Sequence, residues 1–286
     1  MDNKIPDKIK DQHIIVDKSV IGKIANAASL TEHDSVLEIG SGPGNLTKAI
    51  AAHAGLVYAI EKDPGYITEL KKIFGGNRRV MVIEGNALDV KLPQFNKIVS
   101  NPPYKILQPF FLRLLHERKY NFECCVTVAP HGFSKFALAK PGSLDFGVMS
   151  AFFYAFYNVE VIAELKKNAF KPEPRVTSSI LRISPKPNQS PLSLMLKLMF
   201  LEDSRKIGNA MLDALWNNGE FILQNRVTKV EARRIMDKFE NGEQKNQILE
   251  KRVFQLSNEE MVSLVKSMWG HCYAAFEIIF SFMQQP

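Results

Sequence analysis

The sequence predicts an α/β protein with a doubly wound, mostly parallel sheet, followed by a smaller all-α domain. Apolar runs of strand length alternate with amphipathic segments of helix length through the first two thirds of the chain. Glycines, acidic residues or amides follow several of these runs, where a strand gives way to a loop. Beyond a Pro/Ser-rich segment at 184–191, the sequence shows helical periodicity and no strand pattern.

The expected elements follow in chain order. A helix is predicted over 19–30, and further helices over 44–55, 64–75 and 108–118, where Pro64 suits a first helical turn. The predicted strands cover 35–40, 56–63, 80–86, 95–104, 123–130 and 178–185, and 147–165 is expected to hold one or two more. Helical patterns continue over 192–215, 227–239 and 257–269, with a packed terminal helix at 269–282. We therefore expect one domain at 1–185 and a helical domain at 190–286.

The composition is that of a globular protein with a basic surface. Apolar residues make up 45% and charged residues 23% of 286 residues, and the net charge of +7 favours a polyanionic partner such as nucleic acid. Three cysteines, Cys124, Cys125 and Cys272, have neither a disulfide framework nor metal-ligand spacing, so no metal is expected. The polar start and the short apolar tail predict a cytoplasmic protein without a membrane anchor.

A glycine-rich turn follows the first predicted strand, in LEIGSGPGNLT (37–47). Gly40, Gly42 and Gly44 allow close approach of the backbone to a ligand, and Glu38 precedes them. The spacing is G-x-G-x-G, whereas dinucleotide sites use G-x-G-x-x-G. The turn alone is compatible with a nucleotide-type ligand or with a tight strand-to-helix connection.

Polar residues also end the next two predicted strands. Glu61 is placed to accept hydrogen bonds from the hydroxyls of a ribose, and Asn86 to reach the edge of an adenine. Parallel strands present their carboxyl ends at one edge of the sheet, where doubly wound folds bind ligands. The sequence therefore predicts a ligand with a ribose and a base.

The fourth strand runs into VSNPPYK (99–105), a loop stiffened by two prolines. The Asn101 side-chain oxygen and the Pro102 carbonyl can accept hydrogen bonds from a planar amine and so increase its nucleophilicity. Tyr104 can stack on a base. Proximity to a methyl sulfonium would then supply most of the rate, without a metal or a nucleophilic side chain.

These motifs resemble those of S-adenosylmethionine-dependent amino-methyltransferases, in which an Asn/Asp-Pro-Pro-Tyr loop follows an E-x-G-x-G-x-G turn. Three further segments narrow the resemblance to the ribosomal RNA small-subunit adenine N6,N6-dimethyltransferase family: DQHIIVD (11–17), NAFKPEPRVTSSILRI (168–183) and EKRVFQLSNEEMVSLV (250–265). The last of these is similar to archaeal and eukaryotic-type members. The resemblance covers nearly the whole chain and implies a Rossmann-like methyltransferase domain with a helical appendage.

The resemblance implies S-adenosylmethionine as cofactor, ribosomal RNA or the immature small ribosomal subunit as partner, and a monomer. Its motifs imply that Phe170 closes over the second face of the target adenine, opposite Asn101, Pro102 and Tyr104. The cofactor residues implied, with the methionine end first and the adenine end last, are Gln12, His13, Glu38, Gly40, Gly42, Gly44, Glu61, Lys62, Asn86, Ala87, Leu88 and Asn101.

The chain departs from the family pattern at several positions. Pro102 stands where the family has Leu or Ile, and Asn86 replaces the aspartate of Gly-Asp-Ala-Leu. Losing that carboxylate removes a charged acceptor, worth up to ~1–2 kcal/mol of cofactor affinity. The segments 126–138 and 145–150, which flank the target side, match weakly.

These departures leave other functions to weigh against dimethylation of small-subunit RNA. One is an RNA-binding ribosome-assembly factor with weak catalysis. Another is an adenine N6-methylase of another nucleic acid, against which the 250–265 signature argues. A dinucleotide dehydrogenase would leave the Asn-Pro-Pro-Tyr loop without a role.

Overall fold

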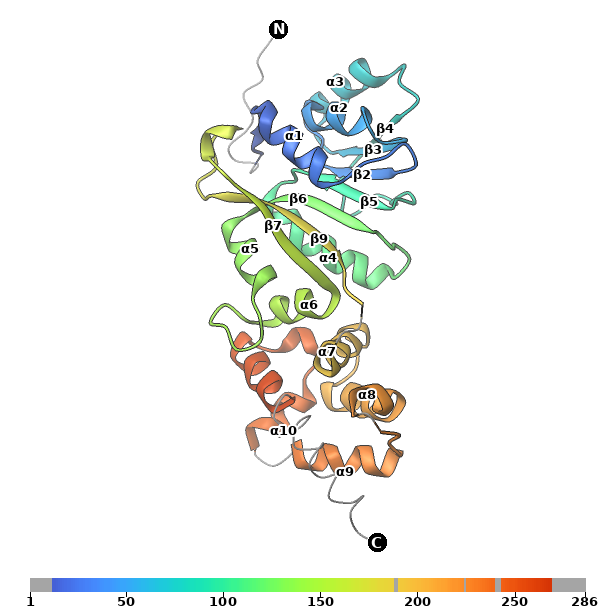
Figure 1. Ribbon diagram of the computed structural model, residues 1–286, viewed down its shortest axis with the longest axis vertical. Coiled ribbons are helices and arrows are strands. Elements are labelled where there is room, and N and C mark those ends of the chain that lie inside the picture. The colour runs from blue at the N-terminus through green and yellow to red at the C-terminus, as the bar shows by residue number, and fades with distance from the viewer. Residues whose placement is uncertain (1–11, 188–189, 224, 240–242, 269–286) are drawn as a thin grey trace. The chain divides into compact units, whose positions relative to one another are not determined.

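The computed structural model describes residues 12–187, 190–223, 225–239 and 243–268 (Figure 1). Contacts divide the chain into two compact units. The first runs to Ser134 and resumes at Val159–Pro185, and the second comprises Lys135–Asn158 and the chain from Lys186 onward. One division therefore falls between Pro185 and Lys186, and residues 135–158 group with the C-terminal helices.

The first unit is built on a seven-stranded sheet with the strand order β4-β3-β2-β5-β6-β9-β7. Strands β2 to β6 are parallel, and β9 pairs with β6 in the antiparallel sense. The strands are β2 (Ser35–Ile39), β3 (Leu56–Glu61), β4 (Val80–Glu84), β5 (Lys97–Ser100), β6 (Cys124–Pro130), β7 (Tyr157–Leu165) and β9 (Ser178–Pro185). The chain moves outward from β2 to β4 and then returns to β5 beside β2, which creates a topological switch point.

One helix precedes the strands of this sheet, and others follow them. They are α1 (Lys18–Ala27), α2 (Asn45–Ala51), α3 (Pro64–Phe74), α4 (Tyr104–Glu117) and α5 (His131–Leu138). Asp63 caps α3 by accepting hydrogen bonds from the amides of Gly65 and Tyr66. Helix α4 begins at Tyr104, four residues before the predicted start, because Pro103 serves as its N-cap.

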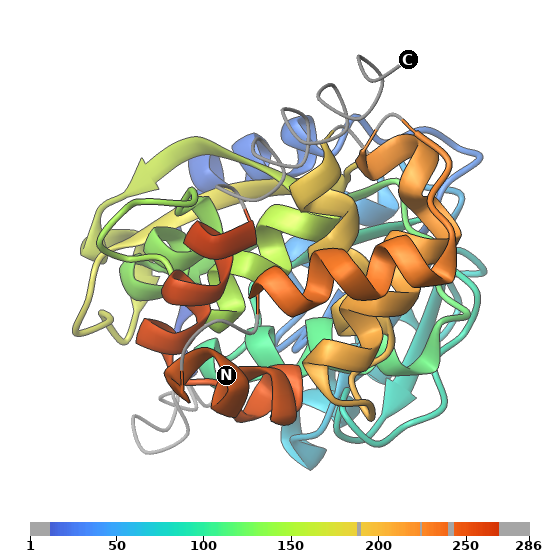
Figure 2. The same ribbon diagram turned by 90° about the horizontal axis from the view of Figure 1, so that it is seen from below.

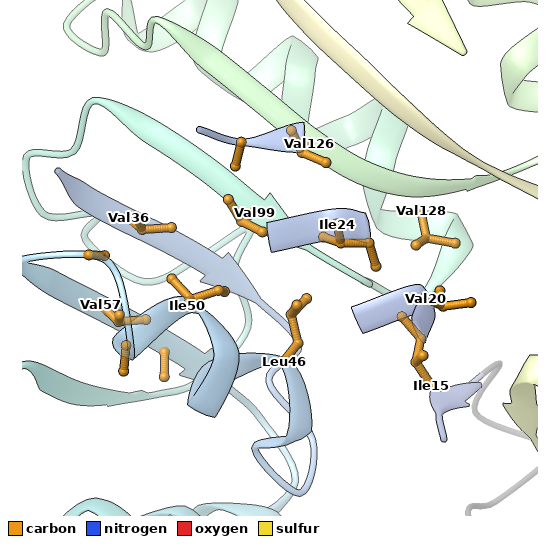
Figure 3. Close-up of a cluster of buried hydrophobic side chains, with 14 of the residues drawn as sticks. Ile15, Val20, Ile24, Val36, Leu46, Ile50, Val57, Val99, Val126 and Val128 are labelled. Atoms are coloured by element: carbon orange, nitrogen blue, oxygen red, sulfur yellow. The ribbon is translucent and has the colours of Figure 1, made fainter. Parts of the chain in front are cut away.

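The core of this unit lies where α1 and α2 pack against the sheet (Figure 3). Ile24, Val36, Ile50 and Val57 are fully buried there. A short ladder of β1 (Ile14–Ile15) with β8 (Phe170–Lys171) adds Ile15 and Phe170 to the same cluster. This two-stranded piece was not predicted from the sequence, because two residues give no periodicity to read.

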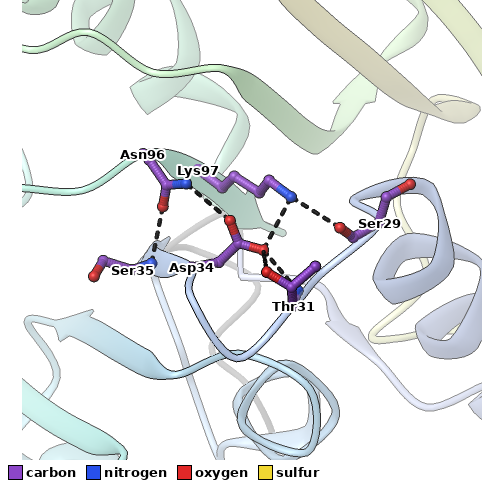
Figure 4. Close-up of polar contacts among 6 residues, drawn as sticks. All are labelled: Ser29, Thr31, Asp34, Ser35, Asn96 and Lys97. Atoms are coloured by element: carbon purple, nitrogen blue, oxygen red, sulfur yellow. Dashed lines mark hydrogen bonds and ion pairs between the residues drawn. The ribbon is translucent and has the colours of Figure 1, made fainter.

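A polar cluster fixes the amino ends of β2 and β5 (Figure 4). The Lys97 ammonium lies 3.0 Å from the Asp34 carboxylate and donates to the Ser29 carbonyl, and Asn96 donates to Asp34 and accepts from the Ser35 amide. Burial raises the pKa of Asp34, but hydrogen bonds from Asn96, Thr31 and Lys97 outweigh it and lower the pKa overall. The cluster therefore ties together the two strands that flank the switch point.

The second unit is helical (Figure 2). It contains α6 (Val148–Phe156), α7 (Pro191–Leu201), α8 (Ile207–Ile222), α9 (Lys229–Phe239), α10 (Glu243–Glu250), the short η3 (Val253–Gln255) and a helix over 258–268. Phe152 and Phe200 are buried in it, and the rings of the partly buried Phe156 and the exposed Phe254 pack against them. The expected terminal helix at 269–282, with Cys272, lies outside the described residues.

The interpretation of 147–165 as strands is wrong for its first half, which forms α6. Phe152 and Phe153 are fully buried in this helix, and its apolar run has no alternation with polar residues. Such a run is compatible with a buried strand or a buried helix, so periodicity cannot separate them. The α/β class with a helical C-terminal region is confirmed. In the part of the chain that the structure describes, no helix has the length and hydropathy of a membrane span.

Candidate active site

Four parallel strands and the N-terminal segment bring ten of the predicted residues to one cleft at the carboxyl edge of the sheet. Its space, together with open solvent at the mouth, is about 800 Å³. The predicted residues that line it are Gln12, His13, Glu38, Gly40, Gly42, Glu61, Lys62, Asn86, Ala87 and Asn101. Gly44, Leu88, Pro102, Tyr104 and Phe170 lie outside this lining.

The glycine turn requires left-handed backbone at its three glycines. Gly40, Gly42 and Gly44 have φ of 71°, 53° and 84°. A Cβ at Gly40 would lie 3.1 Å from Pro103 Cδ, so this glycine lets the Asn-Pro-Pro-Tyr loop approach the turn. A Cβ at Gly44 would meet Phe74 at 2.9 Å. Gly44 therefore serves the packing of α3, whereas Gly40 and Gly42 line the cleft.

Glu61 ends β3 and holds the glycine turn in place. Its Oε2 accepts from the amide of Gly42 at 2.8 Å, and its Oε1 accepts from the amides of Lys62 and Asp63 at 2.8 and 2.9 Å. The carboxylate is 3% exposed and still lines the cleft. Oε1 already accepts two hydrogen bonds, whereas Oε2 accepts one and keeps a lone pair for a ligand.

Glu38 lies deeper, on β2, and is 1% exposed. Its Oε2 accepts from the Thr47 hydroxyl at 2.6 Å. Burial, together with a smaller repulsion from Glu61, raises the pKa of this carboxyl to about 8, against the opposing effect of Thr47. Near neutral pH, Glu38 is therefore mostly protonated.

Asn86 builds the turn that follows β4. Its Oδ1 accepts from the amide of Leu88 at 3.1 Å, and its Nδ2 donates to Asp89 at 2.8 Å. Gly85 enters this turn with φ of 138° and donates its amide to the Glu61 carbonyl. The Asn86 amide thus shapes the adenine end of the predicted site, and Leu88 contributes a backbone contact to it.

Asn101 follows β5 and is held in one orientation. Its Nδ2 donates to the His13 carbonyl at 2.7 Å, and the His13 ring Nδ1 lies 2.9 Å from the Pro172 carbonyl. The Asn101 Oδ1 is buried and finds no hydrogen-bond partner among the described residues. An orphaned buried acceptor is costly, so this oxygen, like the unpartnered Oγ of Ser41 in the same lining, marks a point where a ligand can bind.

The rest of the Asn-Pro-Pro-Tyr loop forms the wall beside Asn101. Pro102 is buried, and Pro103 lines the cleft. The Tyr104 hydroxyl is 2.5 Å from the Ser178 hydroxyl, and its ring lies 5.6 Å from the His13 ring. Burial raises the pKa of Tyr104, which therefore stays protonated at physiological pH.

Phe170 is placed differently from the expectation. Its side chain is 1% exposed and packs in the core cluster with Ile15, its partner on the β1–β8 ladder. Pairing of β8 with β1 places the Phe170 ring in the core. A sequence motif does not indicate whether a side chain is buried in this way. In this conformation, Phe170 supports the segment that carries Gln12 and His13 and does not line the cleft.

Several lining residues were not predicted from the sequence, including Asn45, Tyr66 and Ile106. Asn45 directly follows Gly44 and donates to the Ile15 carbonyl at 3.2 Å, which joins the glycine turn to the N-terminal segment. Tyr66 lies in the first turn of α3, and burial with the charges of Asp63 and Glu61 raises its pKa. Asn45 and Tyr66 could have been predicted from their positions, because each lies shortly after the end of a strand that carries predicted site residues.

The described residues contain no group of His, Cys, Asp and Glu that could hold a metal ion. Cys124 and Cys125 are buried as free thiols on β6, and burial raises the pKa of Cys125 well above its usual value.

Comparison with known proteins places the chain in a family. The family profile described as "Ribosomal RNA adenine dimethylase" matches residues 7–250. A "Probable ribosomal RNA small subunit methyltransferase A" of Thermococcus sibiricus is 33% identical over 262 residues, which cover 91% of this chain and 90% of the relative. The protein of the same name from Thermococcus onnurineus is 34% identical, with 87% and 88% covered.

Solved structures share the fold. A dimethyladenosine transferase from Plasmodium falciparum aligns with a TM-score of 0.60 at 24% identity, over 92% of this chain and 98% of the other. The 23S rRNA methyltransferase ErmE aligns with a TM-score of 0.55 at 21% identity, over 89% and 99%. With the family profile spanning both units and relatives one-third identical over most of their length, the chain belongs to the ribosomal RNA adenine dimethylase family.

Proposed function

We propose that this protein transfers methyl groups from S-adenosylmethionine to N6 of adenosines in small-subunit ribosomal RNA, forming N6,N6-dimethyladenosine during ribosome biogenesis. The observation that carries the proposal is the buried, unpartnered Oδ1 of Asn101 in the wall of a cleft at the switch point. Family membership and the printed names of the archaeal relatives support the same reaction.

The residues of the cleft fit S-adenosylmethionine. Gly40 and Gly42 leave room for close approach of the backbone, Glu61 Oε2 can accept from a ribose hydroxyl, and the turn at Asn86 closes the opposite end. Gln12 and His13 line the end nearest Asn101 and would hold the methionine portion. When bound, this cofactor supplies an electrophilic methyl group on a positively charged sulfur.

Asn101 would orient and activate the target amine. Because its Nδ2 is committed to the His13 carbonyl, the amide cannot rotate without losing that bond, and Oδ1 stays directed away from it. An N6 hydrogen donated to Oδ1 would draw the nitrogen toward a pyramidal, more nucleophilic geometry. The Pro102 carbonyl would take the second hydrogen, with Pro103 limiting the motion of the loop.

Tyr104 would stack on the target adenine, with its hydroxyl anchored to Ser178. A contact of Phe170 with the other face would require Phe170 to leave the core cluster in which it now packs. The net charge of +7 supports a ribosomal RNA partner, through the immature small subunit, and we propose that the protein acts as a monomer.

The test is methyl transfer from radiolabelled S-adenosylmethionine to immature small subunits, with mass spectrometry to locate the product. The wild-type protein should yield dimethyladenosine. Asn101→Ala should lower the transfer rate at least about 100-fold, because it removes the oriented acceptor. Ser100→Ala is the matched control: Ser100 is the buried neighbour, and its hydroxyl lies 3.4 Å from that of Thr127.

Unchanged transfer by Asn101→Ala would refute the role of the loop. Labelling of large-subunit RNA or DNA instead would identify an adenine N6-methylase of another nucleic acid. If calorimetry detects no binding of millimolar S-adenosylmethionine to the wild type, the protein is an RNA-binding assembly factor and the proposal fails.

A further inference from the structure

One side chain outside the cleft holds the turn that forms its adenine end. Arg113, on α4, donates from Nη1 to the Ala87 carbonyl at 2.6 Å and from Nη2 to the Val90 carbonyl at 2.7 Å. Its Nε donates to Glu117 at 2.5 Å, one helical turn later. The side chain is only 14% exposed, so these contacts are partly shielded from water.

The geometry requires a guanidinium. Two carbonyls three residues apart accept from two different nitrogens, while the third nitrogen remains paired with a carboxylate. The ammonium of a lysine is a single point charge and cannot reproduce this fork. Arg113 therefore fixes the position of the turn and also neutralises the charge of the Glu117 carboxylate.

The turn also has bonds of its own, which set its local shape. The amides of Asp89 and Val90 donate to the Asn86 carbonyl at 2.9 and 3.0 Å. These bonds do not connect the turn to α4, and the Gly85 amide, which donates to the Glu61 carbonyl, connects it only to β3. Arg113 supplies the connection to α4, the helix that packs on β6 and begins at Tyr104 in the target loop.

Helix α4 thus joins the two halves of the site. Its first residue follows Asn101-Pro102-Pro103. Nine residues later, Arg113 donates hydrogen bonds to the turn whose Ala87 lines the cleft. We propose that Arg113 is a positioning residue that sets the adenine-end turn relative to the target loop, and thereby determines affinity and base selectivity for the cofactor. This inference rests on the proposed function.

Calorimetry with S-adenosylhomocysteine and its inosine analogue tests the inference. Arg113→Lys retains the charge and aliphatic stem and is the variant least disturbing to the fold; Arg113→Gln is the second variant. Both should bind S-adenosylhomocysteine roughly tenfold more weakly, as expected when hydrogen bonds from a charged group are lost. Both should also discriminate less against the inosine analogue, while kcat at saturating cofactor stays within about twofold of the wild-type value.

Arg118→Gln is the matched control, because it removes an exposed positive charge at the end of the same helix. It should leave affinity and selectivity unchanged. If Arg113→Lys is folded and binds both ligands as the wild type does, the inference is overturned while the proposed function stands. Equal weakening toward both ligands would indicate general loosening and would also overturn it. Absence of binding by the wild type would instead refute the proposed function.

Discussion

Glu38 is a carboxyl group in the cleft wall whose protonation the fold controls. Its exposure of 1% deprives the charged form of water, and the Thr47 hydroxyl only partly compensates. The folded protein therefore binds a proton at this residue that the unfolded chain releases at a lower pH. The stability of the protein must depend on pH through this group.

The sign follows from the raised pKa. The stabilisation linked to protonated Glu38 is fully present below pH 4.5 and is lost as the pH rises to about 8. Glu38→Gln removes this dependence. The unfolding free energy of the wild type, relative to the variant, should fall by at most about 1.4 kcal/mol per pH unit between 5 and 8. Urea unfolding of both proteins at pH 5, 6.5, 8 and 9 measures it. A constant difference across this range would contradict the prediction.

The substitution at Asn86 changes the role of the neighbouring Asp89. The family pattern has an aspartate there, but here the Asn86 Nδ2 donates to Asp89, which supplies the carboxylate of the turn. A second carboxylate at 86 would face Asp89 across a 2.8 Å contact. Restoring the family residue alone therefore creates repulsion.

We expect Asn86→Asp to weaken S-adenosylmethionine binding, despite the charged acceptor that it introduces. The double variant Asn86→Asp with Asp89→Asn should bind at least as tightly as the wild type, because the pair is again complementary. The coupling should be about 1 kcal/mol, in the range for side chains in contact. Calorimetry on the four proteins of the cycle measures this coupling. If Asn86→Asp alone binds as tightly as the double variant, the two residues are not coupled.

At the scale of elements, the glycine turn and the Asn-Pro-Pro-Tyr loop are fitted to each other. Gly40 directly follows β2, and the loop directly follows the neighbouring strand β5, so both emerge at the same edge of the sheet. The prolines give the loop a fixed shape, and the missing Cβ of Gly40 lets Pro102 and Pro103 pack beside the turn.

Gly40→Ala should therefore cost more stability than Gly42→Ala. Both variants place a side chain at positive φ, which costs roughly 1–2 kcal/mol. Only the Gly40 variant also brings a Cβ to 3.1 Å from Pro103, whereas a Cβ at Gly42 meets nothing within 4 Å. Urea unfolding without cofactor separates this steric contribution from ligand effects. Equal losses of unfolding free energy would show that the loop does not press on Gly40.

The elements around the site were predictable because each combines a strong periodicity with a marked end. Strands β2 to β6 are apolar runs, and Asp63-Pro64 marks the start of α3. Helix α6 was not predictable, because an apolar run without alternation fits either state. Residues that are distant in the sequence and pack against α6 determine that this segment is a helix.

At the scale of the whole molecule, strand order assembles the site from residues up to 89 positions apart, such as Gln12 and Asn101. The sequence indicated which residues end the strands, and the parallel sheet brings them together. It could not indicate that Glu61 would bind the Gly42 amide, or that Asn101 would bind the His13 carbonyl. Those hydrogen bonds depend on the three-dimensional positions of the residues, which the spacing of motifs in a sequence does not specify. The burial of Phe170 could not be predicted for the same reason.

The grouping of residues 135–158 with the C-terminal helices has a consequence for the chain as a whole. Helix α6 packs against α7 in the second unit, where Phe152 contacts Phe200 at 5.6 Å between ring centroids and is fully buried. The residues that cover α6 therefore come from beyond the segment 184–191. The first 187 residues do not form a self-contained unit, although the sequence pattern suggested a boundary there.

A protein ending at residue 187 should expose the apolar face of α6. Uncovering Phe152 and Phe156 forfeits about 1.5–3 kcal/mol of burial for each fully exposed ring. We expect this fragment to bind a hydrophobic dye and to self-associate in gel filtration. Phe200→Leu in the full chain is the control, since it removes the aromatic contact but keeps α6 covered, and it should remain monodisperse. A fragment that stays monomeric and unfolds at the wild-type urea concentration would show that α6 is stable without α7.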